Sequence, residues 1–93
     1  MSRPAALDSG VIDEAIAGSP WSRHDDELTC ERSFGSFAAA LGFVVSVGAL
    51  AEAADHHPMI ELRYRTVRLE LSTHDVGSLT QLDLDLARAI DQL

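Results

Sequence analysis

The chain has 93 residues, 46% of them hydrophobic, and 15 acidic residues outnumber seven arginines to give a formal net charge of −8. This length predicts a single domain over 1–93, near the small end of what folds alone. The acidic balance excludes the basic footprint that direct nucleic-acid binding needs. The absence of lysine excludes Schiff-base chemistry and a phosphate-binding loop lysine.

The N-terminal part predicts a tail and a short helix. Residues 1–7 are expected to be a flexible tail. From Val11 to Ile16 the apolar residues follow helical spacing, and Asp8 or Ser9 can cap the helix. Gly18 then marks its end.

An alternating pattern from Leu28 to Phe34 predicts a strand. A turn in 23–27 would pair it with a short strand near Trp21. Arg32 is the charged exception on the apolar parity of this strand.

The longest predicted element is a helix from about Gly35 to Asp55. Three apolar stripes run along it, one of them made of small residues, and almost no polar face remains. A 93-residue chain cannot easily cover such a helix on every side. We therefore expect one face to pack on the chain's own sheet and another on a partner subunit, in a homodimer or homotetramer.

Apolar parity then predicts a hairpin. After Pro58 the apolar residues take even positions from Ile60 to Tyr64, and odd positions from Val67 to Leu71. A parity break at Arg65-Thr66 is typical of a tight turn whose two strands place apolar side chains on one face. Glu61, Arg63, Arg68 and Glu70 line the other face, where we expect individually weak cross-strand ion pairs. Tyr64 is expected to pack.

The last predicted helix begins near Ser78, where Gln81 completes a capping-box pattern and Asp83 falls on the first turn. The complete order is α-β-β-α-β-β-α. It predicts a two-layer α+β fold in which a four-stranded antiparallel sheet carries three helices on one face.

Composition also bears on location. The N-terminus lacks a basic, apolar leader, so no signal peptide is expected. The apolar run over 37–51 is shorter than the ~20 residues of a membrane span. A single cysteine, Cys30, excludes an internal disulfide and suits a reducing compartment. We expect a cytoplasmic protein with no membrane partner.

The chemistry-bearing side chains gather at two element ends. Glu52 and Asp55 precede His56 and His57 where the long helix ends, and His74 follows the second hairpin strand. The start of one antiparallel strand neighbours the end of its partner, so these histidines should meet. Asp83, in the following helix, could join them. Three imidazoles with flanking carboxylates suit general acid–base catalysis near neutral pH.

Other interpretations of these residues stay open. Adjacent histidines at a helix end can be a solvated cap, and histidines with a carboxylate can ligate zinc or iron, although the His-Glu-x-x-His spacing is absent. Cys30 lies in a predicted strand, distant in sequence from the histidines, which disfavours a thiol nucleophile. Trp21 could stack on a ring-shaped ligand or belong to the core.

The combined pattern resembles the pterin-4a-carbinolamine dehydratases over roughly residues 20–93. The residues that carry the likeness are Glu52-x-x-Asp55-His56-His57-Pro58, Tyr64, Val67, Leu71, Thr73-His74, Gly77-Ser78-Leu79 and Asp83, with Trp21, Phe34, Phe37 and Val47 upstream. The chain departs from the family at Met59-Ile60, where an aromatic or acidic residue is usual, and at Arg32, where an aromatic is common.

The resemblance implies dehydration of a 4a-hydroxytetrahydropterin to the quinonoid dihydropterin and water, which recycles the cofactor of aromatic amino acid hydroxylases. It implies no metal and no organic cofactor. It assigns His56, His57 and His74 to catalysis, with the first and last as the hypothetical proton-transfer residues. The supporting carboxylates would be Glu52, Asp55 and Asp83, and the substrate-binding residues Trp21 and Thr73.

The same family implies an alternative function without catalysis. Its members also include protein-binding assembly factors and transcriptional cofactors. The apolar helix over 35–55 would suit such a role as well as it suits self-assembly.

Overall fold

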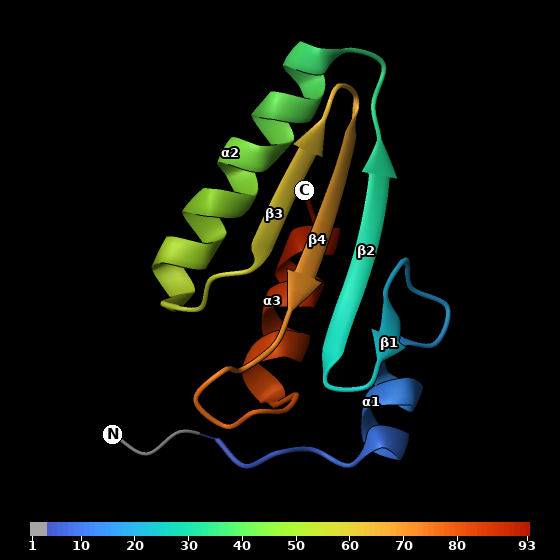
Figure 1. Cartoon of the computed structure of the whole chain (residues 1–93), viewed down its shortest axis with the longest axis vertical. Helices are drawn as coiled ribbons and strands as arrows, with labels where there is room; N and C mark the ends of the chain where they lie inside the picture. The colour runs from blue at the N-terminus through green and yellow to red at the C-terminus, as the bar shows by residue number, and fades with distance from the viewer. Residues whose placement is uncertain (1–3) are drawn as a thin grey trace.

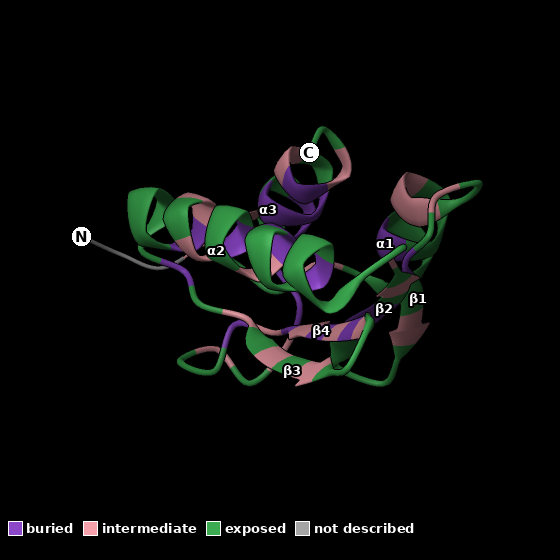
Figure 2. Cartoon of the chain, turned by 90° about the horizontal axis from the view of Figure 1, so that it is seen from above, coloured by how far each residue is buried: buried purple, intermediate pink, exposed green. Residues whose placement is uncertain are grey.

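The computed structural model describes residues 4–93, and its elements follow the predicted α-β-β-α-β-β-α order (Figure 1). They are α1 (Ser9–Ile16), β1 (Ser22–His24), β2 (Glu27–Ser33), α2 (Phe37–Ala54), β3 (Met59–Arg63), β4 (Thr66–Leu71) and α3 (Gln81–Asp91). The three helices cover one face of the sheet (Figure 2). The predicted fold class is therefore confirmed.

The sheet has the order β1-β2-β4-β3, and every neighbouring pair is antiparallel. Alternate residues of the central strands, such as Leu28 and Leu69, are fully or almost fully buried beneath the helices. The opposite face is charged, and Arg68 stands in register with both Glu31 and Glu61. Arg68 does not form the expected ion pair with a residue of a neighbouring strand. Arg68 instead pairs along its own strand with Glu70, at 3.0 Å.

The hairpin of β3 and β4 turns one residue earlier than predicted. Tyr64 and Arg65 form the turn, and Tyr64 takes a left-handed φ of 53°. The expectation that Tyr64 packs was wrong, because its side chain is 70% exposed at the tip of the hairpin. The Arg65 guanidinium lies 5.5 Å from its ring centroid.

Helix α2 packs against the rest of the chain through one buried stripe, which consists of Ala40, Phe43, Val47 and Ala51. The Ser36 side chain caps its N-terminus by accepting from the Ala39 amide at 3.1 Å. The predicted second apolar face is exposed, and Val45 is 66% accessible. A partner subunit on that face stays a prediction.

The length of α2 bears on the expectation that the chain has no membrane span. At 18 residues it is longer than the apolar run over 37–51, and within residues 4–93 it is the one helix long and apolar enough to cross a membrane by length and composition. The helix is in contact with β3, β4 and α3, and Ala40, Phe43 and Val47 of its buried stripe belong to the hydrophobic core.

Two apparent misfits of the sequence have structural explanations. Arg32 lies 5.0 Å above the centroid of the Phe43 ring, so its charged group covers an aromatic face. Leu7 is anchored, because its amide donates to the Leu79 carbonyl at 2.9 Å and its side chain packs on the core. The expected flexible tail therefore does not reach Leu7, and residues 1–3 lie outside the described residues.

Candidate active site

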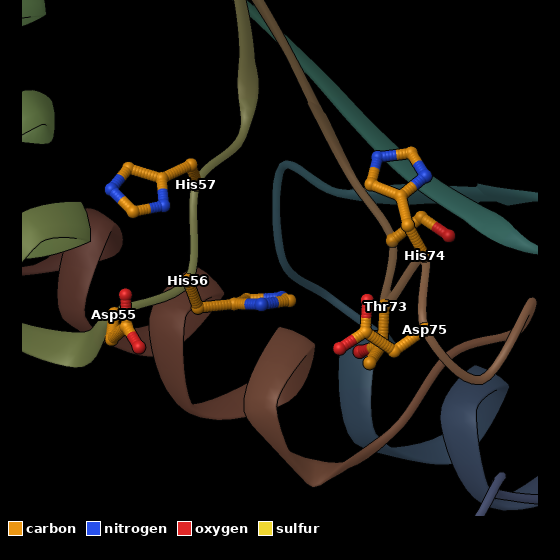
Figure 3. A pocket seen from close by; sticks show the side chains of 7 residues that line it. Asp55, His56, His57, Thr73, His74 and Asp75 are labelled. Carbon is orange, nitrogen blue, oxygen red and sulfur yellow. The ribbon is translucent and has the colours of Figure 1, made fainter. Parts of the chain in front are cut away.

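A pocket of about 210 Å³ opens where α2 ends and β4 ends. It is lined by Asp55, His56, His57, Ser72, Thr73, His74 and Asp75 (Figure 3). Residues 55–57 and 72–75 meet because β3 begins beside the point where its antiparallel partner β4 finishes. The predicted convergence of the three histidines is thus present as geometry. We call this cavity the histidine pocket.

His56 is the buried histidine of the pocket. Asp55 ends α2 in a left-handed conformation, with φ 50° and ψ 43°, and the His56 amide then donates to the Ala51 carbonyl at 3.1 Å. This tight turn directs the His56 ring inward, where the residue is 7% exposed. Its Nε2 lies 2.6 Å from Oδ1 of Asp83, whose side chain is fully buried.

Asp83 reaches His56 from the N-terminal turn of α3. It belongs to a capping box with Thr80, and its Oδ2 accepts from the Thr80 amide at 2.9 Å. The capping box predicted at Ser78 and Gln81 was therefore wrong by two residues. Oδ2 also accepts from the Thr73 hydroxyl at 2.8 Å. One carboxylate thus holds His56 and the residue that precedes His74.

Thr80 completes this buried network and was missed by the sequence interpretation. The single hydroxyl proton of Thr73 goes to Asp83, so the 2.8 Å contact between the two threonine hydroxyls needs Thr80 as the donor. The Thr80 oxygen accepts from the Leu82 amide at 3.2 Å. A Thr-x-x-Asp pattern at 80–83, which overlaps the Ser-x-x-Gln pattern at 78–81, was the available signal.

The network also determines how His56 can meet a ligand. An ionised Asp83 only accepts hydrogen bonds, so the proton between it and His56 lies on Nε2. The remaining ring nitrogen, Nδ1, is the one that His56 can offer to a bound molecule. Among residues 4–93 no buried side-chain nitrogen or oxygen lacks a partner.

His57 is paired in a different environment. Its Nε2 lies 2.7 Å from Oε1 of Glu52, but the two side chains are 55% and 80% exposed. Because α2 ends between them, Glu52 approaches from the helix while His57 already belongs to the segment that leads into β3. The pair is therefore surrounded largely by water.

His74 lies opposite His57, and His56 lies between and below them in the close view (Figure 3). His74 is exposed and belongs to a turn over 74–77, which ends at Gly77 with a left-handed φ of 72°. The amides of Val76 and Gly77 both donate to the Thr73 carbonyl, at 3.0 and 2.9 Å. Thr73 therefore anchors this turn through its backbone and reaches Asp83 through its side chain.

Trp21 does not line the histidine pocket. The residue is 4% exposed within the hydrophobic core, and its Nε1 donates to Oδ1 of Asp91 at 2.8 Å. The structure agrees with the core alternative for Trp21, and substrate binding by this residue stays a prediction. The Trp21 ring packs in the core, and its one polar atom already has a hydrogen-bond partner.

The described residues do not form the arrangement that the metal-site alternative requires. Within residues 4–93 no group of three or more histidine, cysteine, aspartate or glutamate side chains is arranged to hold a metal ion. Cys30 is buried in β2, and this burial raises the pKa of its thiol. It does not line the histidine pocket.

The model of the family described as Pterin 4 alpha carbinolamine dehydratase matches residues 5–93. The chain belongs to this family. A protein of Roseiflexus sp. (strain RS-1), provisionally named pterin-4-alpha-carbinolamine dehydratase, is 51% identical over 94% of this chain and 95% of its own length. One of Nocardia farcinica with the same provisional name is 49% identical over 89% and 93%.

Two solved structures share the fold. A "transcriptional coactivator/pterin dehydratase" from Brucella melitensis superposes with a TM-score of 0.88 and 29% identity over 94% of this chain and 96% of that one. A pterin dehydratase-like protein described as a RuBisCO assembly factor of the alpha-carboxysome gives 0.63 with 23% identity over 77% and 83%, which supports the fold alone.

Proposed function

We propose that this protein dehydrates a 4a-hydroxytetrahydropterin to the quinonoid dihydropterin and water. Family membership supports the substrate class. The observation that carries the proposal is the histidine pocket itself, where three imidazoles from two sequence segments line one cavity. Recycling of the pterin cofactor of aromatic amino acid hydroxylases would be its physiological role, in the cytoplasm.

The reaction requires two proton transfers. The C4a–O bond breaks and its electron pair leaves with the hydroxyl oxygen, which takes up a proton to depart as water. The N5 proton passes to a base, and the N5 electrons form the new double bond to C4a. Imidazoles in opposite protonation states can do both near neutral pH.

His56 and His74 are the proposed proton-transfer residues. Asp83 holds the His56 ring by its Nε2, which leaves Nδ1 to exchange a proton with the substrate. His74 lies across the pocket on a turn that Thr73 anchors. His57, on the exposed side beside Glu52, is proposed to assist at the hydroxyl, and Asp55 to line the same rim.

The direct test is the dehydration rate of synthetic carbinolamine with His56→Ala and His74→Ala variants. Loss of general acid–base catalysis should lower the rate by about 10²- to 10⁴-fold. His24→Ala is the matched control, because His24 is an exposed histidine in β1 outside the pocket, and it should leave the rate unchanged. Near-wild-type rates for both test variants would contradict the proposal.

A non-catalytic protein-binding role is the second candidate. The exposed face of α2 favours it, since Phe37, Leu41 and Val45 are 47%, 44% and 66% accessible. We propose that this face mediates a homodimer or homotetramer, and a partner protein could use the same surface. Val45→Glu should produce monomers in sedimentation experiments without abolishing dehydration. An unchanged sedimentation coefficient would show that the face is not used for self-assembly.

A further inference from the structure

A second, smaller pocket shares two residues with the histidine pocket. Its volume is about 80 Å³. Its lining residues come from the starts of β2 and β3 and from β4 and the segment beyond it: Glu27, Met59, Glu70, Leu71, Ser72 and His74. We call it the sheet-face pocket.

Strand parity locates this pocket on the face of the sheet opposite the helices. Leu28 and Leu71 are buried beneath the helices, so their neighbours Glu27 and Glu70 point to the other side. Met59 is the register partner of Glu70 and shares its face. The three side chains therefore surround one spot at the end of the sheet where β4 leads to His74.

The two pockets are neighbours along a single short segment. Ser72 and His74 line both, while Asp75 lines only the histidine pocket and Glu70 only the sheet-face pocket. A ring bound among the histidines could therefore extend a substituent past His74 into the smaller cavity.

The size of the sheet-face pocket limits what can enter it. A water molecule takes up about 30 Å³ in the liquid, so a cavity of about 80 Å³ holds roughly two or three groups of that size. A short chain can place part of its length in this space, whereas an aromatic ring with further groups attached does not fit.

The lining favours a hydroxylated chain and disfavours an anionic one. The carboxylates of Glu27 and Glu70 accept hydrogen bonds, Ser72 can donate or accept, and the Met59 thioether supplies an apolar wall. Among residues 4–93 no arginine lines either pocket. The nearby Arg68 is already held by Glu70, with two contacts of 3.0 and 3.2 Å.

We propose that the sheet-face pocket binds the substituent of the pterin ring and selects a short, uncharged, hydroxylated chain over an anionic one. This inference rests on the proposed function. It assigns specificity to residues of β2 and β3 that take no part in proton transfer.

Binding of non-reacting 7,8-dihydropterins tests it without depending on turnover. The three probes carry at C6 a methyl group, a dihydroxypropyl chain, or the phosphate ester of that chain, and calorimetry gives Kd for each. We expect the diol to bind more tightly than the methyl compound. The phosphate ester should bind about tenfold more weakly than the diol, from like-charge repulsion at a separation of roughly 6 Å in water.

Two variants test whether residues of the sheet-face pocket cause the preference for the diol over the phosphate ester. Glu27→Gln keeps the size of the side chain but removes its charge, and should shrink the preference for diol over phosphate about threefold. Met59→Arg should tighten binding of the phosphate ester by at least about threefold, since Met59 is 61% exposed and tolerates a charged side chain. Glu31→Gln is the matched control on the same face of β2, outside both pockets, and should change nothing.

The outcomes separate this inference from the proposed function. Equal affinities for the diol and the phosphate ester, or a preference that neither variant alters, would overturn the proposed role of the sheet-face pocket even if dehydration were fast. A preference that the two variants shift as expected, with no dehydration of any carbinolamine, would support the pocket and overturn the proposed catalysis.

Discussion

Two histidine–carboxylate pairs flank the histidine pocket with almost the same geometry but in opposite environments. His56 lies 2.6 Å from Asp83, with side chains 8% and 0% exposed. His57 lies 2.7 Å from Glu52, with side chains 55% and 80% exposed. The contrast teaches that the length of a hydrogen bond says little about how much it contributes to stability. Burial and the number of further hydrogen-bond partners decide that contribution.

The physical reason is the alternative available to each group when its partner is lost. Water replaces His57 or Glu52 readily, and exposed ion pairs contribute about 0–1 kcal/mol to stability. Water cannot reach the Asp83 carboxylate, which also accepts from Thr73 and from the Thr80 amide. A buried polar group left without a partner costs about 1–3 kcal/mol, and more when it is charged. Only the buried pair can therefore hold a ring in one orientation.

The largest effect should follow from Asp83→Asn. An asparagine offers one oxygen and one NH₂ group, so it cannot accept from His56 and from the Thr73 and Thr80 donors at once. With its oxygen towards the two threonines, its NH₂ group faces His56 Nε2, which can accept only if the imidazole proton moves to Nδ1. We expect a loss of about 1–3 kcal/mol in the free energy of unfolding, measured by denaturant titration. The dehydration rate should also fall by about 10²-fold, because His56 loses its fixed tautomer.

Asp85→Asn is the matched control for this change. It lies on the exposed side of α3, where it accepts from Gln81 at 2.8 Å. Its stability and rate should stay near those of the unaltered protein. If Asp83→Asn changed stability and rate as little as Asp85→Asn, the claim that burial makes the His56–Asp83 pair important would be contradicted.

An intermediate effect is expected from Thr80→Val, which removes the helix cap and the donor to Thr73. Stability should fall by about 1–2 kcal/mol, as for other lost caps. Thr80 is a positioning residue, so kcat should fall about tenfold while KM changes little. Thr80→Ser should restore both the cap and kcat.

Ser36→Ala separates the two consequences of losing Thr80. It removes the cap of α2, which is of the same kind but exposed and outside the histidine pocket. It should lower stability and leave kcat unchanged. A fall in kcat as large as that of Thr80→Val would mean that general destabilisation, and not positioning, explains the threonine result.

The smallest effect should come from Glu52→Gln at the exposed pair. The free energy of unfolding should change by less than about 0.5 kcal/mol, since the pair is largely solvated. We expect kcat to change by no more than about twofold, and high salt applied to the unaltered protein should mimic the substitution because it screens the same contact. A loss approaching that of Asp83→Asn would show that exposure does not weaken this pair.

Where sequence-based prediction succeeded, a short-range pattern was sufficient. The parity break near 64–66 predicted a hairpin, and the hairpin alone brings His56 and His57 beside His74. Prediction failed where two local patterns competed or where burial decided. The overlapping caps at 78–81 and 80–83 look alike in sequence, and Tyr64 was expected to pack although it lies in an exposed turn.

The sequence by itself determined the order of the elements and the meeting of the three histidines, because periodicity and strand pairing are local rules. The fold family was indicated separately, by the resemblance of its motifs to a known family. Only the tertiary structure decided which histidine is buried and which carboxylate holds it. His56 and Asp83 are 27 residues apart and belong to segments that meet only when α3 packs under the end of α2. Burial is a property of that packing, so the residues that most strictly orient the site are the ones that no local pattern could distinguish.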